Sequence, residues 1–89
     1  MSDSIEARVQ SIIAADLGID RRKVTSEARI QGGLTADSVD VGELMMALEE
    51  EFKREISDEE AVQVVTVQDA IDLVKKKLTK YFTAGSANF

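Results

Sequence analysis

Residues 37–52 read DSVDVGELMMALEEEF, and this stretch decides the fold. Its apolar side chains recur three and four positions apart, which is the spacing of one face of an α-helix. Those side chains are Val41, Leu44, Met45, Leu48 and Phe52. Asp37 and Asp40 lie at the start, where the helix dipole favours negative charge. The stretch therefore predicts an amphipathic helix that begins at Asp37 or Ser38 and ends near Phe52.

Similar patterns on both sides of this stretch predict three more helices. Upstream, an apolar stripe predicts a helix from about Asp3 to Leu17, with Gly18 as its left-handed stop. Downstream, we expect a short helix at residues 58–64 and a fourth helix that starts with Thr66 as its cap. Capping boxes mark both starts, Ser57 with Glu60 and Thr66 with Asp69. The apolar stripes are Ile5, Val9, Ile12, Ile13 and Leu17 in the first helix, and Val67, Ala70, Ile71, Val74 and Leu78 in the fourth.

These elements predict an all-α fold, a small four-helix bundle of three longer helices and one short helix with a long first loop. The loop covers residues 19–36, with Val24, Ile30 and Leu34 as its expected apolar anchors. A chain of 89 residues fits one domain. We expect the domain to cover residues 1–82 and a flexible C-terminal tail to follow at 83–89, where the side chains are mostly small and polar.

The charge of the chain is acidic and concentrated in its middle. The net charge is −6, and residues 37–60 hold ten acidic and two basic side chains. This balance argues against nucleic acid as a partner. No apolar run approaches the roughly 18 residues that a membrane span needs, and residues 1–6 do not resemble a signal peptide. We therefore expect a cytoplasmic, monomeric protein.

The residue types argue against catalysis by the chain itself. There is no His and no Cys, so a serine nucleophile has no imidazole base and thiolate chemistry is excluded. The acidic residues do not follow the spacing of a calcium-binding loop. We therefore predict no catalytic residues and no metal site.

Ser38 has two interpretations from its position at the start of the predicted helix. It can be a plain N-cap, and position alone favours this interpretation. It can also be an exposed hydroxyl that accepts a modification, because a phosphate at a helix N-terminus meets free backbone amides. The neighbouring Asp37 and Asp40 oppose a phosphate electrostatically.

Nearly the whole chain, from about Ile5 to Leu78, resembles the acyl carrier protein family. The resemblance lies in residues 5–9, 16–19 and 36–38, in Glu43-Leu44 and 47–52, and in 55–56, 58–60 and 66–72. It implies that a phosphopantetheinyl transferase, with coenzyme A and magnesium, attaches 4′-phosphopantetheine to Ser38. The terminal thiol of that arm then holds an acyl group as a thioester, which explains how a chain without Cys handles thioesters.

The resemblance also implies a partner-binding face on the predicted second helix, at Asp37, Val39, Asp40, Gly42, Glu43, Met46 and Glu50. The implied partners are the transferase, enzymes of fatty-acid or polyketide synthesis, and acyltransferases. Val39, Gly42, Gly33 and Ser57 depart from the residues that are common in the family, so a specialised lipid or polyketide pathway is one reading. Two alternatives stay open: an unmodified acidic module that binds basic proteins, and a peptidyl carrier loaded with amino acids.

Overall fold

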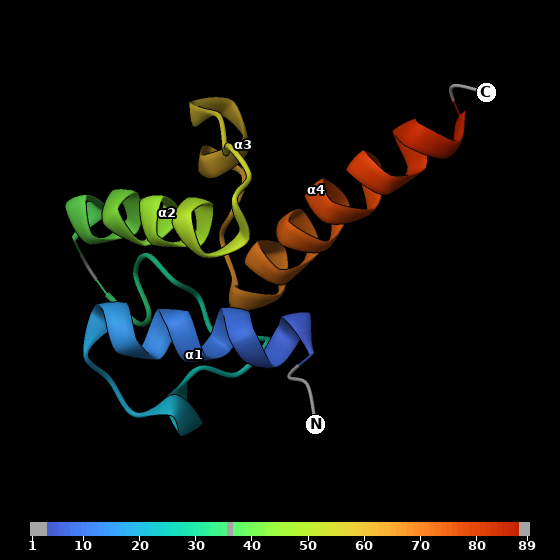
Figure 1. Ribbon diagram of the computed structural model, residues 1–89. Coiled ribbons are helices and arrows are strands. Elements are labelled where there is room, and N and C mark those ends of the chain that lie inside the picture. Colours follow the sequence, from blue (N-terminus) through green and yellow to red (C-terminus); the bar gives the residue numbers. More distant parts are fainter. Residues whose placement is uncertain (1–3, 36, 88–89) are drawn as a thin grey trace.

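The computed structural model describes residues 4–35 and 37–87, with side chains up to Leu78. Its helices are α1 (Ile5–Leu17), α2 (Ser38–Phe52), α3 (Asp58–Val62) and α4 (Val67–Ala87), with a 3₁₀ turn, η1 (Arg21–Lys23), in the first loop. The predicted all-α bundle of three longer helices and one short helix is confirmed. In Figure 1, α1 and α2 run side by side in opposite directions, and α4 leaves the bundle at an angle. Within the described residues, none of these helices is both long and apolar enough to cross a bilayer.

The helix ends differ from the sequence predictions by one to two residues. The first helix begins at Ile5 because Ser4 is its cap, with Ser4 Oγ accepting from the amide of Ala7 at 3.1 Å. Gly18 is the left-handed stop as predicted, with φ of 67°. The predicted last turn of α3 is wrong, because the amide of Val64 bonds three residues back to Ala61 and the chain leaves the helix after Val62. The backbone of α4 is helical to Ala87, and the boundary between domain and tail at residue 82 stays a prediction.

The capping boxes predicted for the third and fourth helices are confirmed, whereas Asp3, the predicted cap of the first helix, lies outside the described residues. Ser57 Oγ accepts from the amide of Glu60 at 3.1 Å, and Glu60 Oε1 accepts from the amide of Ser57 at 3.0 Å. Thr66 and Asp69 exchange the same two bonds, each at 3.1 Å. Each box satisfies two amides that a helix start otherwise leaves unpaired, so the starts of α3 and α4 are fixed by local sequence.

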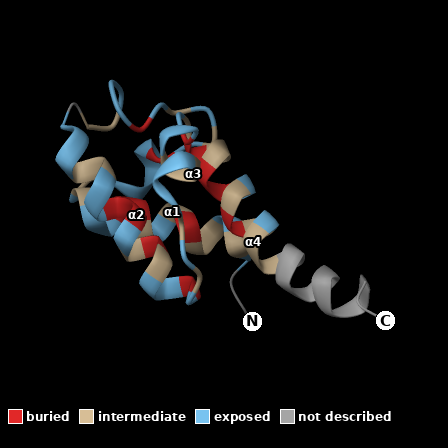
Figure 2. Ribbon diagram, turned by 90° about the horizontal axis from the view of Figure 1, so that it is seen from above, coloured by how far each residue is buried: buried red, intermediate tan, exposed pale blue. Residues whose placement is uncertain are grey.

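The core lies between α1, α2 and α4 and is almost entirely aliphatic. Figure 2 shows the buried positions on the inner sides of these helices. Its fully buried members include Val9 and Ile13 from α1, Leu44 and Leu48 from α2, and Val67 and Ile71 from α4. These are members of the predicted apolar stripes. The helical spacing of the sequence therefore placed the three packed faces correctly.

The long first loop is bound to the bundle by side chains and by backbone. Val24 and Ile30 are buried, as predicted, and Leu34 is half-buried against the core. The amide of Ile30 donates to the carbonyl of Val65 at 2.9 Å, and the amide of Val67 donates to that of Ala28 at 2.9 Å. Backbone hydrogen bonds thus hold the first loop against the α3–α4 connection. They fix the position at which the end of this loop reaches α2.

Acid is expected to destabilise the fold partly through Glu60. Lys77 Nζ lies 2.6 Å from Glu60 Oε1, and this bond, with the backbone bond from Ser57, lowers the Glu60 pKa from 4.5 to about 2. A carboxylate with a depressed folded-state pKa stabilises the fold above its unfolded value, so this contribution is lost as the pH falls from 4.5 to about 2. Urea unfolding of Glu60→Gln should show a shallower loss of stability over this window than the parent chain. The control is Glu59→Gln, an exposed neighbour, and an equal slope in both variants would contradict the assignment.

Candidate functional site

Ser38 is the first residue of α2 and does not cap it. The cap is Asp37, whose Oδ1 accepts from the amide of Val39 at 2.9 Å. The capping interpretation of Ser38 is therefore wrong, because Asp37, one residue earlier, occupies the cap position. Ser38 is exposed, and its hydroxyl makes no hydrogen bond to any other described residue. The local sequence thus leaves, at the positive end of a helix, a hydroxyl without a partner among the residues that the structure describes.

The end of the first loop is braced against the first turn of α2 by Thr35. Its Oγ1 donates to Asp40 Oδ2 at 2.9 Å and accepts from the amide of Asp37 at 3.2 Å. Asp40 is half-buried as a result, although the sequence placed it with the exposed partner-binding residues. Sequence reasoning missed Thr35. A threonine two residues before a helix cap is a signal that could have found it, because its hydroxyl can accept from the amide two positions on.

The loop before Thr35 makes a tight turn that needs glycine at position 33. The amide of Leu34 donates to the carbonyl of Arg29 at 2.8 Å. A Cβ added to Gly33 would lie 2.3 Å from that same carbonyl oxygen. Position 33 therefore requires glycine because the backbone of Gly33 lies too close to the backbone of Arg29 to leave room for a side chain.

Four of the predicted partner-binding residues come together on the α3 side of α2. Val39, Gly42, Glu43 and Met46 line one groove of about 420 Å³, which Met45, Glu49, Ile56, Asp58 and Ala61 complete. Val39 and Met46 are 63% and 62% exposed, which is high for large apolar side chains. The groove adjoins the start of α2, so an apolar surface with acidic residues lies beside Ser38.

Gly42 has no structural reason to be glycine. It lies inside α2, and a Cβ at this position would meet no atom within 4 Å. Glycine in a helix interior costs about 1 kcal/mol relative to alanine. Neither close packing nor a positive φ accounts for this cost.

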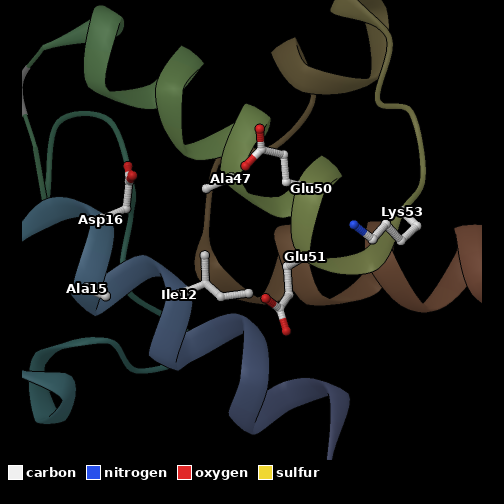
Figure 3. A pocket seen from close by; sticks show the side chains of 7 residues that line it. All are labelled: Ile12, Ala15, Asp16, Ala47, Glu50, Glu51 and Lys53. Carbon is white, nitrogen blue, oxygen red and sulfur yellow. The ribbon is translucent and has the colours of Figure 1, made fainter.

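Glu50, the remaining predicted partner residue, lies on the other side of α2. Figure 3 shows it in an open groove of about 690 Å³ between α1 and α2, with Ile12, Ala15, Asp16, Ala47, Glu51 and Lys53. Glu51 is paired with Arg8 at 2.6 Å, and the Arg8 guanidinium lies 4.7 Å from the centre of the Phe52 ring. The predicted partner face is therefore divided between two sides of the helix rather than continuous.

Glu49, one of the acidic residues of α2, forms a structural hydrogen bond in addition to contributing negative charge. Glu49 Oε2 accepts from the amide of Ile56 at 2.7 Å and so holds the α2–α3 connection. Within residues 4–35 and 37–87, no three acidic side chains gather closely enough to hold a metal ion. The acidity of this region is thus spread over a surface.

A comparison with protein-family models finds one family that matches most of the chain. Residues 7–74 match the model described as "Phosphopantetheine attachment site". The match covers α1 from its third residue, the first loop, α2, α3 and the first turns of α4, so it includes Ser38 and the loop that leads to it. The chain therefore belongs to the family of carrier domains that bear a covalently attached 4′-phosphopantetheine.

Proposed function

We propose that Ser38 is the residue that bears the arm, and that the chain carries acyl groups between enzymes of fatty-acid, lipid or polyketide synthesis. The observation that supports this most is the Ser38 hydroxyl, which is exposed and makes no hydrogen bond to the other described residues, because Asp37 caps the helix. When bound, the arm supplies the terminal thiol on which an acyl group is held. The chain has no cysteine, so it offers no thiol of its own.

The position of Ser38 suits a phosphodiester. The first amides of a helix point toward its N-terminus, where the dipole favours an anion. Asp37 and Asp40 add negative charge that opposes a phosphate, and their carboxylates accept from the amide of Val39 and from the hydroxyl of Thr35, respectively. In the attachment step the Ser38 oxygen forms a bond to phosphorus, and the phosphoanhydride bond of coenzyme A breaks. Adenosine 3′,5′-bisphosphate leaves, and the hydroxyl proton passes to a base of the transferase.

The groove beside Ser38 supports a docking role. Its apolar residues Val39 and Met46 are exposed next to Glu43. A partner with a basic rim and an apolar centre matches this surface, and exposed acids speed such encounters by steering them. We include Asp37, Asp40 and Glu50 in the proposed partner-binding set, with Glu50 on the α1 side. The partners are the transferase, synthesis enzymes and acyltransferases.

Intact mass separates this function from that of an unmodified acidic module. The purified chain is incubated with coenzyme A, magnesium and a phosphopantetheinyl transferase of broad substrate range. We expect a gain of one phosphopantetheine group per chain, located by peptide mapping to the peptide that contains Ser38. An unchanged mass would reject the proposal. Loading the modified chain with acyl and aminoacyl donors then distinguishes an acyl carrier from a peptidyl carrier.

Gly42 supports a specialised pathway rather than general fatty-acid synthesis. Gly42 lowers the stability of α2, and no contact inside the described fold requires a glycine there. We therefore attribute the glycine to a partner side chain that approaches the helix at this point. Gly42→Val should stabilise the chain by a few tenths of a kcal/mol. It should also raise the elongation rate by a general fatty-acid ketosynthase severalfold, and slow the enzymes of the native pathway.

The matched control for this prediction is Gly42→Ala, which removes the helix penalty but fills less of the groove. The three chains are acylated and compared as substrates of the same ketosynthase. If Gly42→Val and the parent chain are elongated equally fast, the glycine plays no part in the choice of partner.

A further inference from the structure

The Thr35 hydroxyl bonds to residues on both sides of Ser38. It accepts from the amide of Asp37, the residue before Ser38, and donates to the carboxylate of Asp40, two residues after it. Asp37 in turn caps the amide of Val39. These three bonds form one connected set around the exposed hydroxyl. They join the end of the loop to the first turn of α2.

The chemistry of this connection requires a hydroxyl at position 35. A hydroxyl donates one proton and accepts through its lone pairs, and here it does both. Its bond to a carboxylate is charge-assisted, and bonds of this kind are about twice as strong as neutral ones. Valine has nearly the shape of threonine but can make neither bond, whereas serine can make both. The pair Thr35→Val and Thr35→Ser therefore separates the bonds from the packing.

Without these bonds the start of α2 has little else to hold it. Asp37, Ser38 and Val39 are all exposed, and none of them belongs to the buried core, so they contribute little packing to the first turn. Helix ends that lack packing open more readily than helix interiors. The side chains that pack α2 on the core begin at Val41 and Leu44, one turn further along. The Thr35 bonds are thus the described side-chain link between the loop and the residues that flank Ser38.

We infer that Thr35 is a positioning residue for the modification of Ser38. It fixes the first turn of α2 so that the hydroxyl is presented in one orientation to the transferase. This inference rests on the proposed function of Ser38. Displacement of a reacting atom by 1 Å can slow an enzymatic step by about a hundredfold. Loss of the Thr35 bonds should therefore lower kcat, while the docking groove and hence KM stay nearly unchanged.

The test compares kcat and KM for phosphopantetheine transfer to the parent chain, Thr35→Val and Thr35→Ser. We expect about a tenfold lower kcat for Thr35→Val with KM within about twofold, and recovery of most of the loss in Thr35→Ser. Amide hydrogen exchange measured by NMR should be faster at Asp37 and Val39 in Thr35→Val alone. Circular dichroism confirms that each variant is folded.

Two control variants separate positioning from general stability. Thr25→Val changes an exposed loop threonine whose side chain makes no hydrogen bond to the described residues. Ser4→Ala removes the cap residue of α1, a residue that does not contact the described loop end or the start of α2, and should destabilise the fold by about 1 kcal/mol, yet leave kcat unchanged. Parent-like kcat in Thr35→Val, or an equal loss in Ser4→Ala, would overturn the role of Thr35 and leave that of Ser38 intact. If the parent chain itself is not modified, both proposals fail, so the two failures are distinguishable.

Discussion

Replacement of Ser38 by alanine is expected to abolish phosphopantetheine attachment and leave the stability of the chain almost unchanged. The loss of modification is complete because the acceptor oxygen is removed. The free energy of unfolding should change by less than about 0.5 kcal/mol, since Ser38 is exposed and makes no bond that holds the described fold. The measurements are the intact mass after reaction with the transferase and the urea unfolding midpoint.

Asp37→Ala is the matched control for this experiment. It removes the side chain that caps α2 and should cost about 0.5–2 kcal/mol. The Ser38 hydroxyl remains, so this variant should still be modified. The two neighbouring variants are thus expected to show opposite patterns, one losing modification and the other stability. A phosphopantetheine group found on the Ser38→Ala chain would move the attachment to another serine.

Gly33→Ala is expected to destabilise the chain by about 1–3 kcal/mol, among the larger effects of a single methyl group. The added Cβ would lie 2.3 Å from the carbonyl oxygen of Arg29. That carbonyl is backbone and also accepts from Leu34, so it cannot turn aside as a flexible side chain does. The loop must shift, and Thr35 shifts with it. We therefore also expect slower modification of Ser38.

Gly42→Ala is the matched control for Gly33→Ala, because it adds the same methyl group at a position where no atom lies within 4 Å of the new Cβ. It should stabilise the chain by up to about 1 kcal/mol. Urea unfolding of the two variants should move the midpoint in opposite directions from that of the parent. If Gly33→Ala is as stable as the parent chain, the close approach of the loop backbone does not constrain position 33.

The sequence predicted the features that depend on local pattern. The period of α2, from Val41 to Phe52, identified its buried face, and Val39 was expected on the surface, as observed. The sequence also led us to expect Met46 in the core with Met45 and Leu48, and this was wrong, because Met46 is 62% exposed and lines the groove beside Ser38. Val24 and Ile30 were identified as loop anchors because isolated apolar residues in a polar loop need burial. The resemblance to a carrier family agrees with the match over residues 7–74.

The features that the sequence did not predict depend on contacts between segments. Asp37 and Ser38 are both good capping residues, and only the backbone at the end of the loop decides between them. The bond from Thr35 to Asp40 requires the loop to end beside α2, which no periodicity encodes. Gly33 looked like an ordinary turn residue, because its neighbour Arg29 is brought close by the folded loop.

The backbone bonds between the first loop and the α3–α4 connection bear on when the molecule becomes a substrate. The loop that leads to Ser38 pairs at Ala28 and Ile30 with Val65 and Val67, which are synthesised more than thirty residues later. Contacts this distant in sequence close late in folding. A nascent chain that has emerged only as far as α3 therefore contains the serine but not the partners that order the loop before it. On the proposed function of Ser38, we therefore expect modification during translation to be slow until the chain as far as Val67 has left the ribosome.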